Sequence, residues 1–472
     1  MAGNLHVVMV PWSAFGHLIP MFQLSIALAK AGAKVSILST PRNIQRLPKI
    51  PQNLTSLIHL VEVPFPTLLH HDEQVLPEGA EATVDIPLDK IQYLKVAYDL
   101  LQQPLRQFVS AQSPDWIITD LIAYWAVEIA QEHHVSLMAF SVFSVVTLLF
   151  CGPPEYLVGD GQKRLRSSPE SWTKPPEWAD LPSSIAFKIY EAVGLHAGFY
   201  ENNASGKSDA ERAARVLQGC QAVAFRTCSE YEGEYINLYE KLIGKPVIPV
   251  GLLPQLIPEK TQFIDESWRN IFNWLDKQKH KSVVFVGFGS ECKLTKDQVY
   301  EIAYGLELSG LPFLWALRKP SWANKDLDAL PSGFGQRTSK TGIVGIGWAP
   351  QMEILAHPSI GGSLFHSGLG SVIETLQFGH CLVVLPMTAD QPLNARFLVE
   401  KELAVEVERS EDGSFSRNGI AKALRLAMVS EEGEKYRMHA KEAAQVFGNH
   451  NLHQNYYINM FVEFLKNGVA KG

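Results

Sequence analysis

Residues 348–391 read WAPQMEILAHPSIGGSLFHSGLGSVIETLQFGHCLVVLPMTADQ. Apolar spacing and glycine positions predict a short helix at 351–356, a buried strand at 362–365, a helix at 371–378 and a second strand at 382–385. Strands that alternate with helices are typical of a parallel sheet covered by helices on both faces. This stretch therefore predicts an α/β fold.

The same alternation continues on both sides of the stretch, so we predict two doubly wound, Rossmann-like α/β domains facing a cleft. We assign 1–250 to an N-terminal domain, 251–270 to a linker and 271–450 to a C-terminal domain. Residues 451–472 contain a helical pattern that we expect to return to the N-terminal domain. Further strands are predicted at 5–10, 34–38, 57–63, 115–119, 136–140, 282–288, 313–317, 342–346 and 404–407, further helices at 19–30, 90–110, 124–134, 295–308, 391–401, 417–429 and 431–447, and an irregular stretch at 153–206.

Composition and charge exclude several classes of protein. With 46% hydrophobic and 19% charged residues the 472-residue chain is globular rather than disordered, and a net charge of −7 argues against a nucleic-acid partner. Five scattered Cys residues without a CxxC pair fit a reducing compartment. The longest apolar run, 135–151, is too short for a membrane span, and residues 1–12 lack a signal-peptide pattern. We expect a cytoplasmic monomer without an integral membrane segment.

The loop after the predicted strand 362–365 has the features of an anion-binding site. Residues 366–371 read HSGLGS, in which Gly368 and Gly370 let a ligand approach the backbone closely. A helix is predicted to begin at Ser371, and the free N–H groups and dipole of its N-terminus suit a pyrophosphate. Ile373 stands where the dinucleotide fingerprint has its third glycine, which argues against a nicotinamide enzyme.

Each of the notable side chains also has a purely structural alternative. Ser371 and Glu374 match a capping box. Asp390 precedes a Gln-Pro pair and could cap the next helix. Trp348 could be a core aromatic, and His366 could be a hydrogen-bonded histidine at a strand end. The spacing of these residues, more than any one of them, distinguishes a binding site from these structural roles.

The 44 residues from Trp348 to Gln391 strongly resemble the donor-binding signature of plant family-1 UDP-glycosyltransferases, and the general layout matches over most of the chain. The resemblance implies a GT-B fold and an inverting transfer of a hexose from a UDP-sugar to a hydroxyl group. Carried over by position, the resemblance implies that Trp348 stacks on uracil, that the backbone of Ala349 and the side chain of Gln351 help to hold the base, and that Glu374 accepts hydrogen bonds from the ribose diol. It also implies that the diphosphate is bound by Ser290, His366, Gly368, Gly370 and Ser371. Hydroxyls of the sugar would be held by Asp390 and Gln391.

The chain departs from the family at residues 366–371, where HSGLGS stands in place of the common HCGWNS. This variant, together with DQPLNAR at 390–396 and PWSAFGH at 11–17, resembles the subgroup that adds a sugar to the sugar of an existing plant glycoside, such as a flavonoid or terpenoid glycoside. Gln391 fits glucose by family analogy. Two alternatives stay open: a UDP-rhamnose-dependent rhamnosyltransferase acting on glycosides, and an aglycone O-glucosyltransferase.

His17 is the candidate general base. It follows the predicted strand 5–10 and lies close to a helix that is predicted to begin around Ile19-Pro20. A neutral imidazole can take the proton from an acceptor hydroxyl near pH 7. Asp120 ends the predicted strand 115–119, and two strand ends of one parallel sheet can bring these side chains together. Asp120 would then steady the imidazolium, as in a catalytic triad; alternatively, both residues cap helices.

The acceptor is expected to contact loops of the N-terminal domain, where Phe15, Tyr124 and Phe143 are candidates because aromatic rings pack on flat aglycones. Asp326 and Asp328 form a D-x-D pattern, which we interpret as part of a solvated loop. Because helix N-termini can offset the charge of the diphosphate, we predict no required metal and no cofactor besides the UDP-sugar co-substrate. Two other functions stay open: another sugar-nucleotide enzyme, such as a retaining transferase or an epimerase, and a non-catalytic UDP-sugar-binding module.

Overall fold

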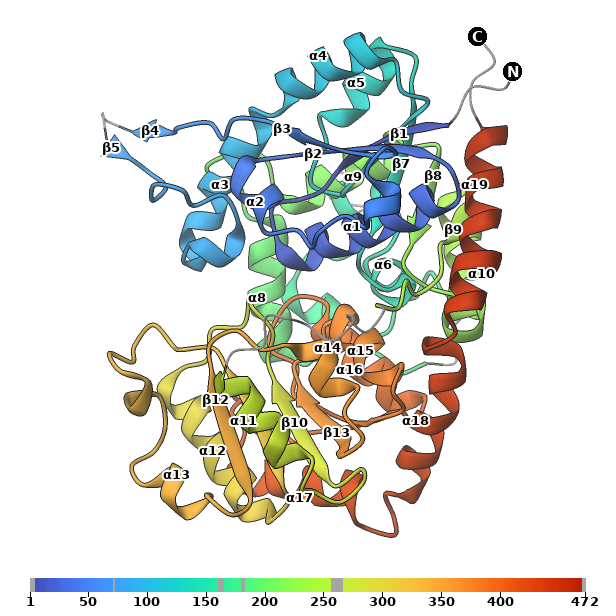
Figure 1. The fold of residues 1–472 in the computed structure, drawn as a ribbon. Helices are drawn as coiled ribbons and strands as arrows, with labels where there is room; N and C mark the ends of the chain where they lie inside the picture. Colours follow the sequence, from blue (N-terminus) through green and yellow to red (C-terminus); the bar gives the residue numbers. More distant parts are fainter. Residues whose placement is uncertain (1–4, 71–72, 160–164, 180–182, 256–265, 469–472) are drawn as a thin grey trace. The chain divides into compact units, whose positions relative to one another are not determined.

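The computed structural model describes residues 5–70, 73–159, 165–179, 183–255 and 266–468, and the chain divides into two compact units (Figure 1). Unit 1 comprises Met1–Pro182, Ala192–Leu253 and His450–Gly472, and unit 2 comprises Ser183–Glu191 and Pro254–Asn449. Residues 256–265 of the predicted linker lie outside the described residues.

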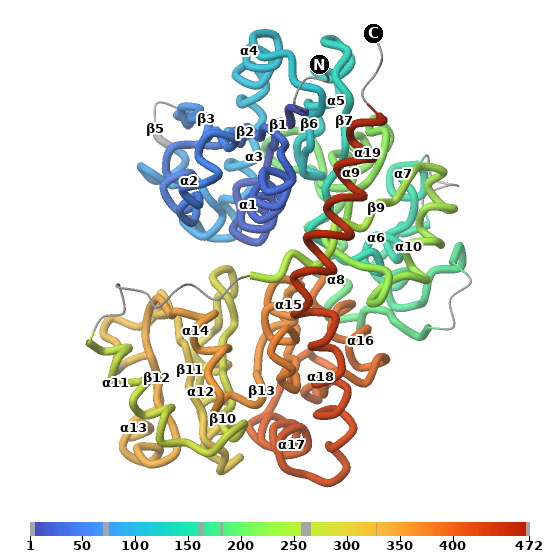
Figure 2. Tube along the Cα trace, turned by 45° about the vertical axis from the view of Figure 1, so that its right-hand side comes forward, coloured from blue at the N-terminus to red at the C-terminus, as the bar shows by residue number. Residues whose placement is uncertain are grey.

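Unit 1 is built on a sheet of seven parallel strands in the order β3-β2-β1-β6-β7-β8-β9. Figure 2 shows β3, β2, β1, β6 and β7 side by side in this order. The chain moves outward from β1 to one edge and from β6 to the other, so the topological switch point lies between β1 and β6. The strands are β1 (His6–Val10), β2 (Lys34–Ser39), β3 (Ile58–Glu62), β6 (Trp116–Thr119), β7 (Ser136–Ser141), β8 (Ala222–Phe225) and β9 (Val247–Pro249), with β4 (Leu69–His70) and β5 (Glu73–Gln74) forming a separate antiparallel pair.

β1, an interior strand of this sheet, is covered on both faces. All five residues of β1 are buried, and successive side chains of a strand point to opposite faces. A continuous apolar run of this kind is typical of a parallel sheet between two layers of helices. The helices of unit 1 are α1 (Phe15–Lys30), α2 (Pro41–Gln45), α3 (Ile91–Asp99), α4 (Gln102–Gln112), α5 (Ala126–Glu132), α6 (Val145–Cys151), α7 (Pro154–Val158), α9 (Asp209–Gly219), α10 (Ser229–Ile243) and α19 (Ile458–Asn467), while α8 (Ile189–Tyr200) begins in the segment assigned to unit 2.

The end of the chain packs into unit 1. Leu452–Tyr457 forms a wide helical turn that leads into α19. Phe461 and Leu465 of α19 are buried in the same apolar core as Val7 of β1. The indole Nε1 of Trp116 donates a hydrogen bond to the carbonyl of Leu465 at 2.9 Å. Residues of α19 and of β1 therefore belong to the same apolar core of unit 1.

Unit 2 is built on a sheet of six parallel strands in the order β12-β11-β10-β13-β14-β15, with its switch point between β10 and β13. These strands are β10 (Val283–Gly287), β11 (Phe313–Leu317), β12 (Gly342–Ile346), β13 (Ile360–Phe365), β14 (Cys381–Val384) and β15 (Ala404–Glu406). The helices are α11 (Glu266–Leu275), α12 (Lys296–Ser309), α13 (Phe334–Arg337), α14 (Gln351–Leu355), α15 (Leu369–Leu376), α16 (Gln391–Glu400), α17 (Arg417–Met428) and α18 (Glu434–Phe447).

Alternate residues of β10 belong to two different cores. Val284 and Val286 pack in one apolar cluster with residues of α12 and α17. Val283 and Phe285 pack in another with residues of α11 and α14. The period of two along a strand explains this division, and the prediction of two doubly wound α/β domains is confirmed by the two parallel sheets.

Two predicted helices and one stretch predicted to be irregular differ from the structure in this way. The helix predicted at 90–110 is two helices, α3 and α4, because Pro104 has no N–H to donate to the carbonyl of Leu100. α1 begins at Phe15 with Pro20 inside it, so the predicted start near Ile19 is about one turn too late. The stretch 153–206, predicted to be irregular, contains the helix α8, whose two glycines weaken the sequence pattern of a helix.

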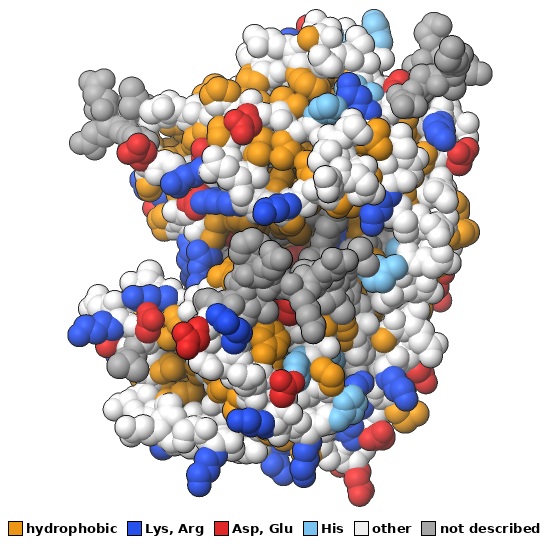
Figure 3. All heavy atoms as spheres, in the orientation of Figure 1, with side chains coloured by type: hydrophobic (Ala, Val, Ile, Leu, Met, Phe, Trp, Pro, Cys, Tyr) orange, Lys and Arg blue, Asp and Glu red, His pale blue; other side chains and the backbone are white. Residues whose placement is uncertain are grey.

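The surface carries charges of both signs. On the face that Figure 3 presents, Lys and Arg side chains are interspersed with Asp and Glu side chains. Over the residues that the structure describes, none of the helices has the length and apolar character that a membrane crossing requires.

Candidate active site

His17 and Asp120 lie together at the switch point of the unit 1 sheet. Asp120 directly follows β6, and His17 lies in the first turn of α1, shortly after β1. β1 and β6 are neighbours, with Val10 paired to Thr119 at their carboxyl ends. Nδ1 of His17 and Oδ2 of Asp120 are 2.6 Å apart, a distance typical of a charge-assisted hydrogen bond. The structure therefore brings the two predicted residues together.

The surroundings of the pair fix the orientation of the imidazole. Asp120 is only 1% exposed, whereas the His17 side chain keeps 16% of its surface exposed. An ionised carboxylate can only accept hydrogen bonds, so the ring proton lies on Nδ1, and Nε2 becomes the ring atom that can accept a proton. The ring of Phe143 meets His17 edge-on, with centroids 5.6 Å apart and planes at 81°.

The three aromatic residues predicted to contact an acceptor have different surroundings. Phe143 lies against His17, as just described. The Phe15 ring has the guanidinium of Arg46 above it, 5.9 Å from its centroid. Tyr124 packs against two cations of its own unit, Arg212 at 5.0 Å and Lys207 at 5.2 Å, and burial raises the pKa of its hydroxyl. Of the three, only Phe143 is in contact with the His17–Asp120 pair among the contacts that the structure describes.

Residues that were predicted to bind the diphosphate lie at the switch point of the unit 2 sheet. His366 follows β13, and its ring lies against the backbones of Gly289 and Gly368, where an added Cβ would approach ring atoms to 2.9 and 2.7 Å. Gly289 also has a φ of +73°, so glycine is needed there on two counts. Ser290 is exposed, and its carbonyl accepts a hydrogen bond from Arg318.

His366 is an uncharged ring with an unused nitrogen. Burial lowers its pKa from 6.5 to about 4. Its Nδ1 is buried and has no hydrogen-bond partner among the described residues, which speaks against the alternative of a histidine whose role is to hydrogen-bond at a strand end. Because leaving a buried polar atom unpaired costs stability, Nδ1 of His366 is a candidate contact for a ligand.

α15 begins at Leu369, with Gly368 as the N-cap residue, so its predicted start at Ser371 is two residues too late. Gly370 and Ser371 consequently lie in the first turn, near the positive end of the helix dipole. Because Gly368 and not Ser371 is the N-cap residue, Ser371 and Glu374 do not form a capping box, and that alternative is wrong. The Glu374 carboxylate instead accepts hydrogen bonds from Nε2 of Gln351 and of Gln255, each at 2.7 Å.

Trp348 presents its indole to solvent. The residue is 75% exposed, so the alternative of a core aromatic is wrong. Its carbonyl accepts a hydrogen bond from Nε1 of Trp268 at 3.2 Å, which fixes the backbone beneath the ring. The next residue, Ala349, packs against an apolar core and accepts the N–H of Gln351 at 2.9 Å. A rigid backbone with an exposed aromatic face suits stacking by a planar base.

Asp390 and Gln391 lie at the start of α16, at the end of the loop after β14. Asp390 occupies the N-cap position of α16, as the structural alternative predicts, but its side chain makes no capping bond to the helix; its carboxylate accepts a hydrogen bond from Asn394 at 2.7 Å. Oε1 of Gln391 accepts the N–H groups of Met387 and Thr388 at 2.9 and 3.0 Å. Both side chains are therefore held by their own loop and helix.

Among the residues in these contacts, Asn394 and Gln255 are absent from the sequence prediction. Asn394 is 3% exposed and also donates to the carbonyl of Ser367 at 3.2 Å, which ties the loops after β13 and β14 together. The spacing of Asp390 and Asn394, four apart on one helix face, was an available signal. Gln255 lies in the predicted linker, and no local pattern relates it to Glu374.

Comparisons with known proteins agree on one family. A family model described as UDP-glucoronosyl and UDP-glucosyl transferase matches residues 265–442. UDP-glycosyltransferase 91A1 of Arabidopsis thaliana is 42% identical over 467 residues, which cover 98% of this chain and 97% of that protein. Soyasaponin III rhamnosyltransferase of Glycine max is 40% identical over 466 residues, with 98% and 95% covered. The solved structure of Glycyrrhiza uralensis UGT73P12 complexed with glycyrrhetinic acid 3-O-monoglucuronide has a TM-score of 0.79 at 23% identity, covering 98% of this chain and 96% of that one.

Proposed function

Because this chain belongs to the plant family-1 UDP-glycosyltransferases, with the GT-B fold, we propose that it transfers glucose, with inversion, from UDP-glucose to a hydroxyl on the sugar of a small plant glycoside. The observation that carries the mechanism is the 2.6 Å contact between His17 Nδ1 and the buried Asp120. A histidine oriented by a buried carboxylate is a general base suited to pH 7.

In the proposed reaction the acceptor hydroxyl gives its proton to Nε2 of His17 as its oxygen attacks the anomeric carbon of the donor. The bond between that carbon and the β-phosphate oxygen breaks, and UDP leaves with the bonding electrons. Attack opposite the leaving group inverts the anomeric configuration. Asp120 stabilises the imidazolium that forms, because its carboxylate is charged, buried and in contact with Nδ1.

We propose that unit 2 binds the donor through the residues described above. The exposed indole of Trp348 takes the uracil, and the Glu374 carboxylate takes the ribose diol in exchange for one of its two amide partners. The N-terminus of α15 and the neutral His366 take the diphosphate. Asp390 and Gln391 take hydroxyls of the sugar. Ser290 supplies a further contact to the phosphates.

We propose that no metal takes part. N–H groups and a helix dipole directed at the diphosphate can offset the charge that develops on the leaving group. Activity should therefore persist in excess EDTA. A loss of turnover in the chelator that Mg²⁺ restores would contradict this proposal.

A second donor, UDP-rhamnose, is favoured by one observation. The relative from Glycine max that is named as a rhamnosyltransferase is 40% identical to this chain over nearly its full length. The two candidate reactions share the base, the nucleotide contacts and the glycoside acceptor, and they differ only in the sugar that contacts Asp390 and Gln391.

The test is a panel of UDP-glucose and UDP-rhamnose against glycosides and their aglycones, scored by product mass and by the anomeric configuration of the product. Glucose transfer to a glycoside with inversion is the expected result. Rhamnose transfer would select the second candidate, and transfer to aglycones alone would overturn the proposed acceptor class. In parallel, His17→Ala should lose roughly 10²–10⁴-fold in turnover while it still binds UDP.

A further inference from the structure

The last turn of α3 is connected to the loop that leads to His17 and to the loop that follows Asp120. The hydroxyl of Tyr98 donates to the carbonyl of Pro11 at 3.1 Å, in the loop between β1 and His17. The neighbouring residue, Asp99, binds Arg212 through both carboxylate oxygens, at 2.7 and 2.6 Å. Arg212 in turn donates to the carbonyl of Ile122 at 3.2 Å, two residues after Asp120. One helix end is therefore connected to both sides of the switch point.

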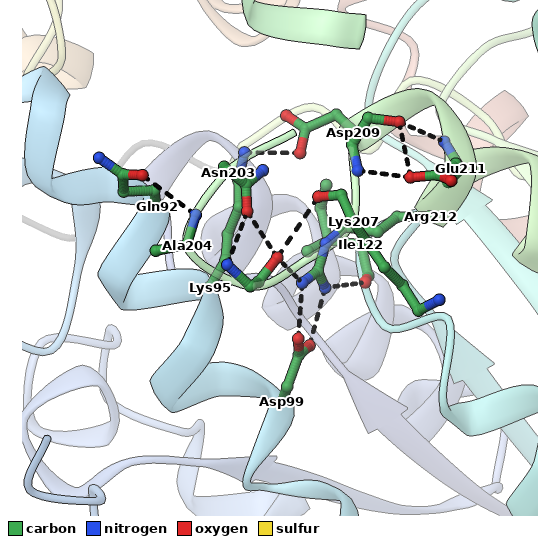
Figure 4. Close-up of polar contacts among 12 residues, drawn as sticks. Gln92, Lys95, Asp99, Ile122, Asn203, Ala204, Lys207, Asp209, Glu211 and Arg212 are labelled. Carbon is green, nitrogen blue, oxygen red and sulfur yellow. Dashed lines mark hydrogen bonds and ion pairs between the residues drawn. The ribbon is translucent and has the colours of Figure 1, made fainter. Parts of the chain in front are cut away.

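Arg212 is the centre of this network (Figure 4). Its side chain is 0% exposed. One terminal nitrogen donates to Asp99 and to Ile122, and the other donates to Asp99 and to the hydroxyl of Ser205 at 2.7 Å. The guanidinium of arginine is planar and carries several donors in a fixed geometry, so it can hold the Asp99 carboxylate, the Ile122 carbonyl and the Ser205 hydroxyl at fixed angles. The network thus also fixes the loop before α9.

Local sequence explains why both partners are placed there. Ser208 and Glu211 form a capping box that starts α9, which directs Arg212 into the interior from the first turn onward. Asp99 is the last residue of α3, a position where the helix dipole disfavours a carboxylate. A buried guanidinium without a paired charge would be costly. The pair is therefore explained by its connections, since neither residue suits its own helix position alone.

Tyr98 holds the other loop with a hydroxyl that stays protonated. The residue is 2% exposed, and burial, together with the charge of Asp120, raises the pKa of its hydroxyl well above the ordinary value. Its ring meets Trp12 edge-on at 4.9 Å. Trp12 lies in the same loop as Pro11, so the ring of Tyr98 and its hydroxyl both contact the loop that leads to His17.

We propose that Tyr98 and Asp99 are positioning residues for the His17–Asp120 pair: Tyr98 sets the loop of His17 through Pro11, and Asp99 sets the loop of Asp120 through Arg212 and Ile122. The inference rests on the proposed function, since it concerns the geometry of the same pair. Neither residue touches a reacting atom. A displacement of about 1 Å between base and substrate can cost roughly 10²-fold in rate, so the distance between the two loops determines turnover.

The chain offers a matched control in the same two helices. Lys95 of α3 pairs with Asp209 of α9, with Nζ and Oδ1 2.5 Å apart, and Lys95 is 8% exposed. This ion pair joins α3 to α9 as Asp99 and Arg212 do, but none of its described hydrogen bonds goes to either loop of the switch point. Lys95→Gln therefore removes an interhelical ion pair and spares the loops.

The experiment compares Asp99→Asn, Tyr98→Phe, Lys95→Gln and His17→Ala in the full-length enzyme. We expect kcat to fall roughly 10–100-fold in Asp99→Asn and about 3–10-fold in Tyr98→Phe, with KM for the UDP-sugar and affinity for UDP unchanged. Lys95→Gln should keep its kcat. Tyr98→Phe retains the ring and its packing, so it tests the inference even if Asp99→Asn does not fold.

Two further readouts separate positioning from loss of structure. The downfield proton resonance of the His17 Nδ1–H, identified by its absence in His17→Ala, should shift or broaden in Asp99→Asn and Tyr98→Phe but not in Lys95→Gln. The pH profile of kcat should shift in the same two variants. If Asp99→Asn and Tyr98→Phe match Lys95→Gln in kcat and in this resonance while His17→Ala is inactive, the inference is overturned and the proposed function stands. An active His17→Ala overturns the proposed function itself.

Discussion

At the scale of single residues, the two histidines of the candidate site have opposite surroundings. His17 has a buried carboxylate 2.6 Å from Nδ1, which favours the imidazolium that forms when the ring takes a proton. No carboxylate among the described residues pairs with His366, and burial lowers its pKa to about 4, which disfavours an imidazolium. These surroundings are consistent with the proposed roles, proton transfer for His17 and neutral hydrogen bonding for His366.

The contribution of Asp120 can be measured with a substitution of nearly equal shape. In Asp120→Asn the amide offers no charge to the imidazolium and favours the wrong tautomer of His17, so we expect kcat to fall roughly 10³–10⁴-fold. KM for the UDP-sugar should change little, because the residues proposed to bind the donor belong to unit 2. Steady-state kinetics at several pH values check this. A variant with more than about a tenth of the original kcat would remove Asp120 from the mechanism.

A second residue-scale prediction concerns Trp348. Stacking of a base on an aromatic ring contributes about 1–3 kcal/mol, so Trp348→Ala should raise the dissociation constant of UDP by about 5–150-fold. The indole is 75% exposed, so the melting temperature should stay within about a degree of the original, as for most exposed positions. Calorimetric titration with UDP is the measurement. An unchanged affinity would show that uracil binds elsewhere.

At the scale of elements, the strands were predictable and the helix starts were less so. The predicted strands 313–317 and 342–346 coincide with β11 and β12, because each is a short run made up mainly of apolar residues, a sequence pattern of strands. The predictions for α1 and α15 relied on Pro20 and on the Ser371 side chain. Both helices begin earlier, at N-cap residues without a side-chain capping bond, and such starts leave little trace in a sequence.

In the candidate site, too, some features were predictable from the sequence and others were not. Residues that belong to a fixed local spacing, such as Trp348 and Glu374, were predictable as a set. The contact of His17 with Asp120 was also predictable, because both residues follow the carboxyl ends of strands in one sheet. The contacts of Gln255 with Glu374 and of Asp99 with Arg212 were not predictable, because they depend on how elements pack. Periodicity does not show which of these side chains meet, so their partners required the structure.

An element-scale prediction concerns α16, whose first residues are proposed to hold the sugar. Arg396 of α16 forms two hydrogen bonds with Glu191, both at 2.8 Å, and the side chains are 14% and 6% exposed. Glu191→Gln should destabilise unit 2 by about 3 kcal/mol, the lower end of the range for a broken buried pair, because Arg396 keeps Glu406 at 3.4 Å. KM for the UDP-sugar should rise in parallel.

The control for this prediction is Lys188→Gln. Nζ of Lys188 lies 3.8 Å from Oε1 of Glu406, and the Lys188 side chain is 43% exposed. Exposed ion pairs contribute about 0–1 kcal/mol to the free energy of unfolding. Urea unfolding followed by tryptophan fluorescence compares the two variants. Equal unfolding midpoints for Glu191→Gln and Lys188→Gln would contradict a structural role of the buried pair.

At the scale of the whole molecule, buried histidines make the fold sensitive to mild acid. Burial lowers the pKa from 6.5 to about 4 for His6 and to about 3 for His380. Below pH 6.5 the unfolded chain binds protons at these residues, whereas the folded chain does not until the pH approaches 4 or 3. The free energy of unfolding therefore falls as the pH drops through this window, by up to about 3 kcal/mol for His6.

Thermal unfolding between pH 7.5 and 4.5 checks this whole-molecule prediction. The melting temperature should decrease steadily below pH 6.5. His380→Phe, whose ring can still pack on Phe378, should show a shallower decrease because one titrating group is gone. Parallel curves for the two proteins would exclude His380 as a source of the acid sensitivity.

The position of α19 has a consequence for how the protein is made. β1 is translated before Phe461 and Leu465 of α19, which are buried in the same core. Until α19 has been synthesised, the nascent chain exposes the apolar face around Trp116 that this helix covers. Translation intermediates stalled before α19 should therefore bind chaperones, and this binding should end once the helix has emerged and packed on that face.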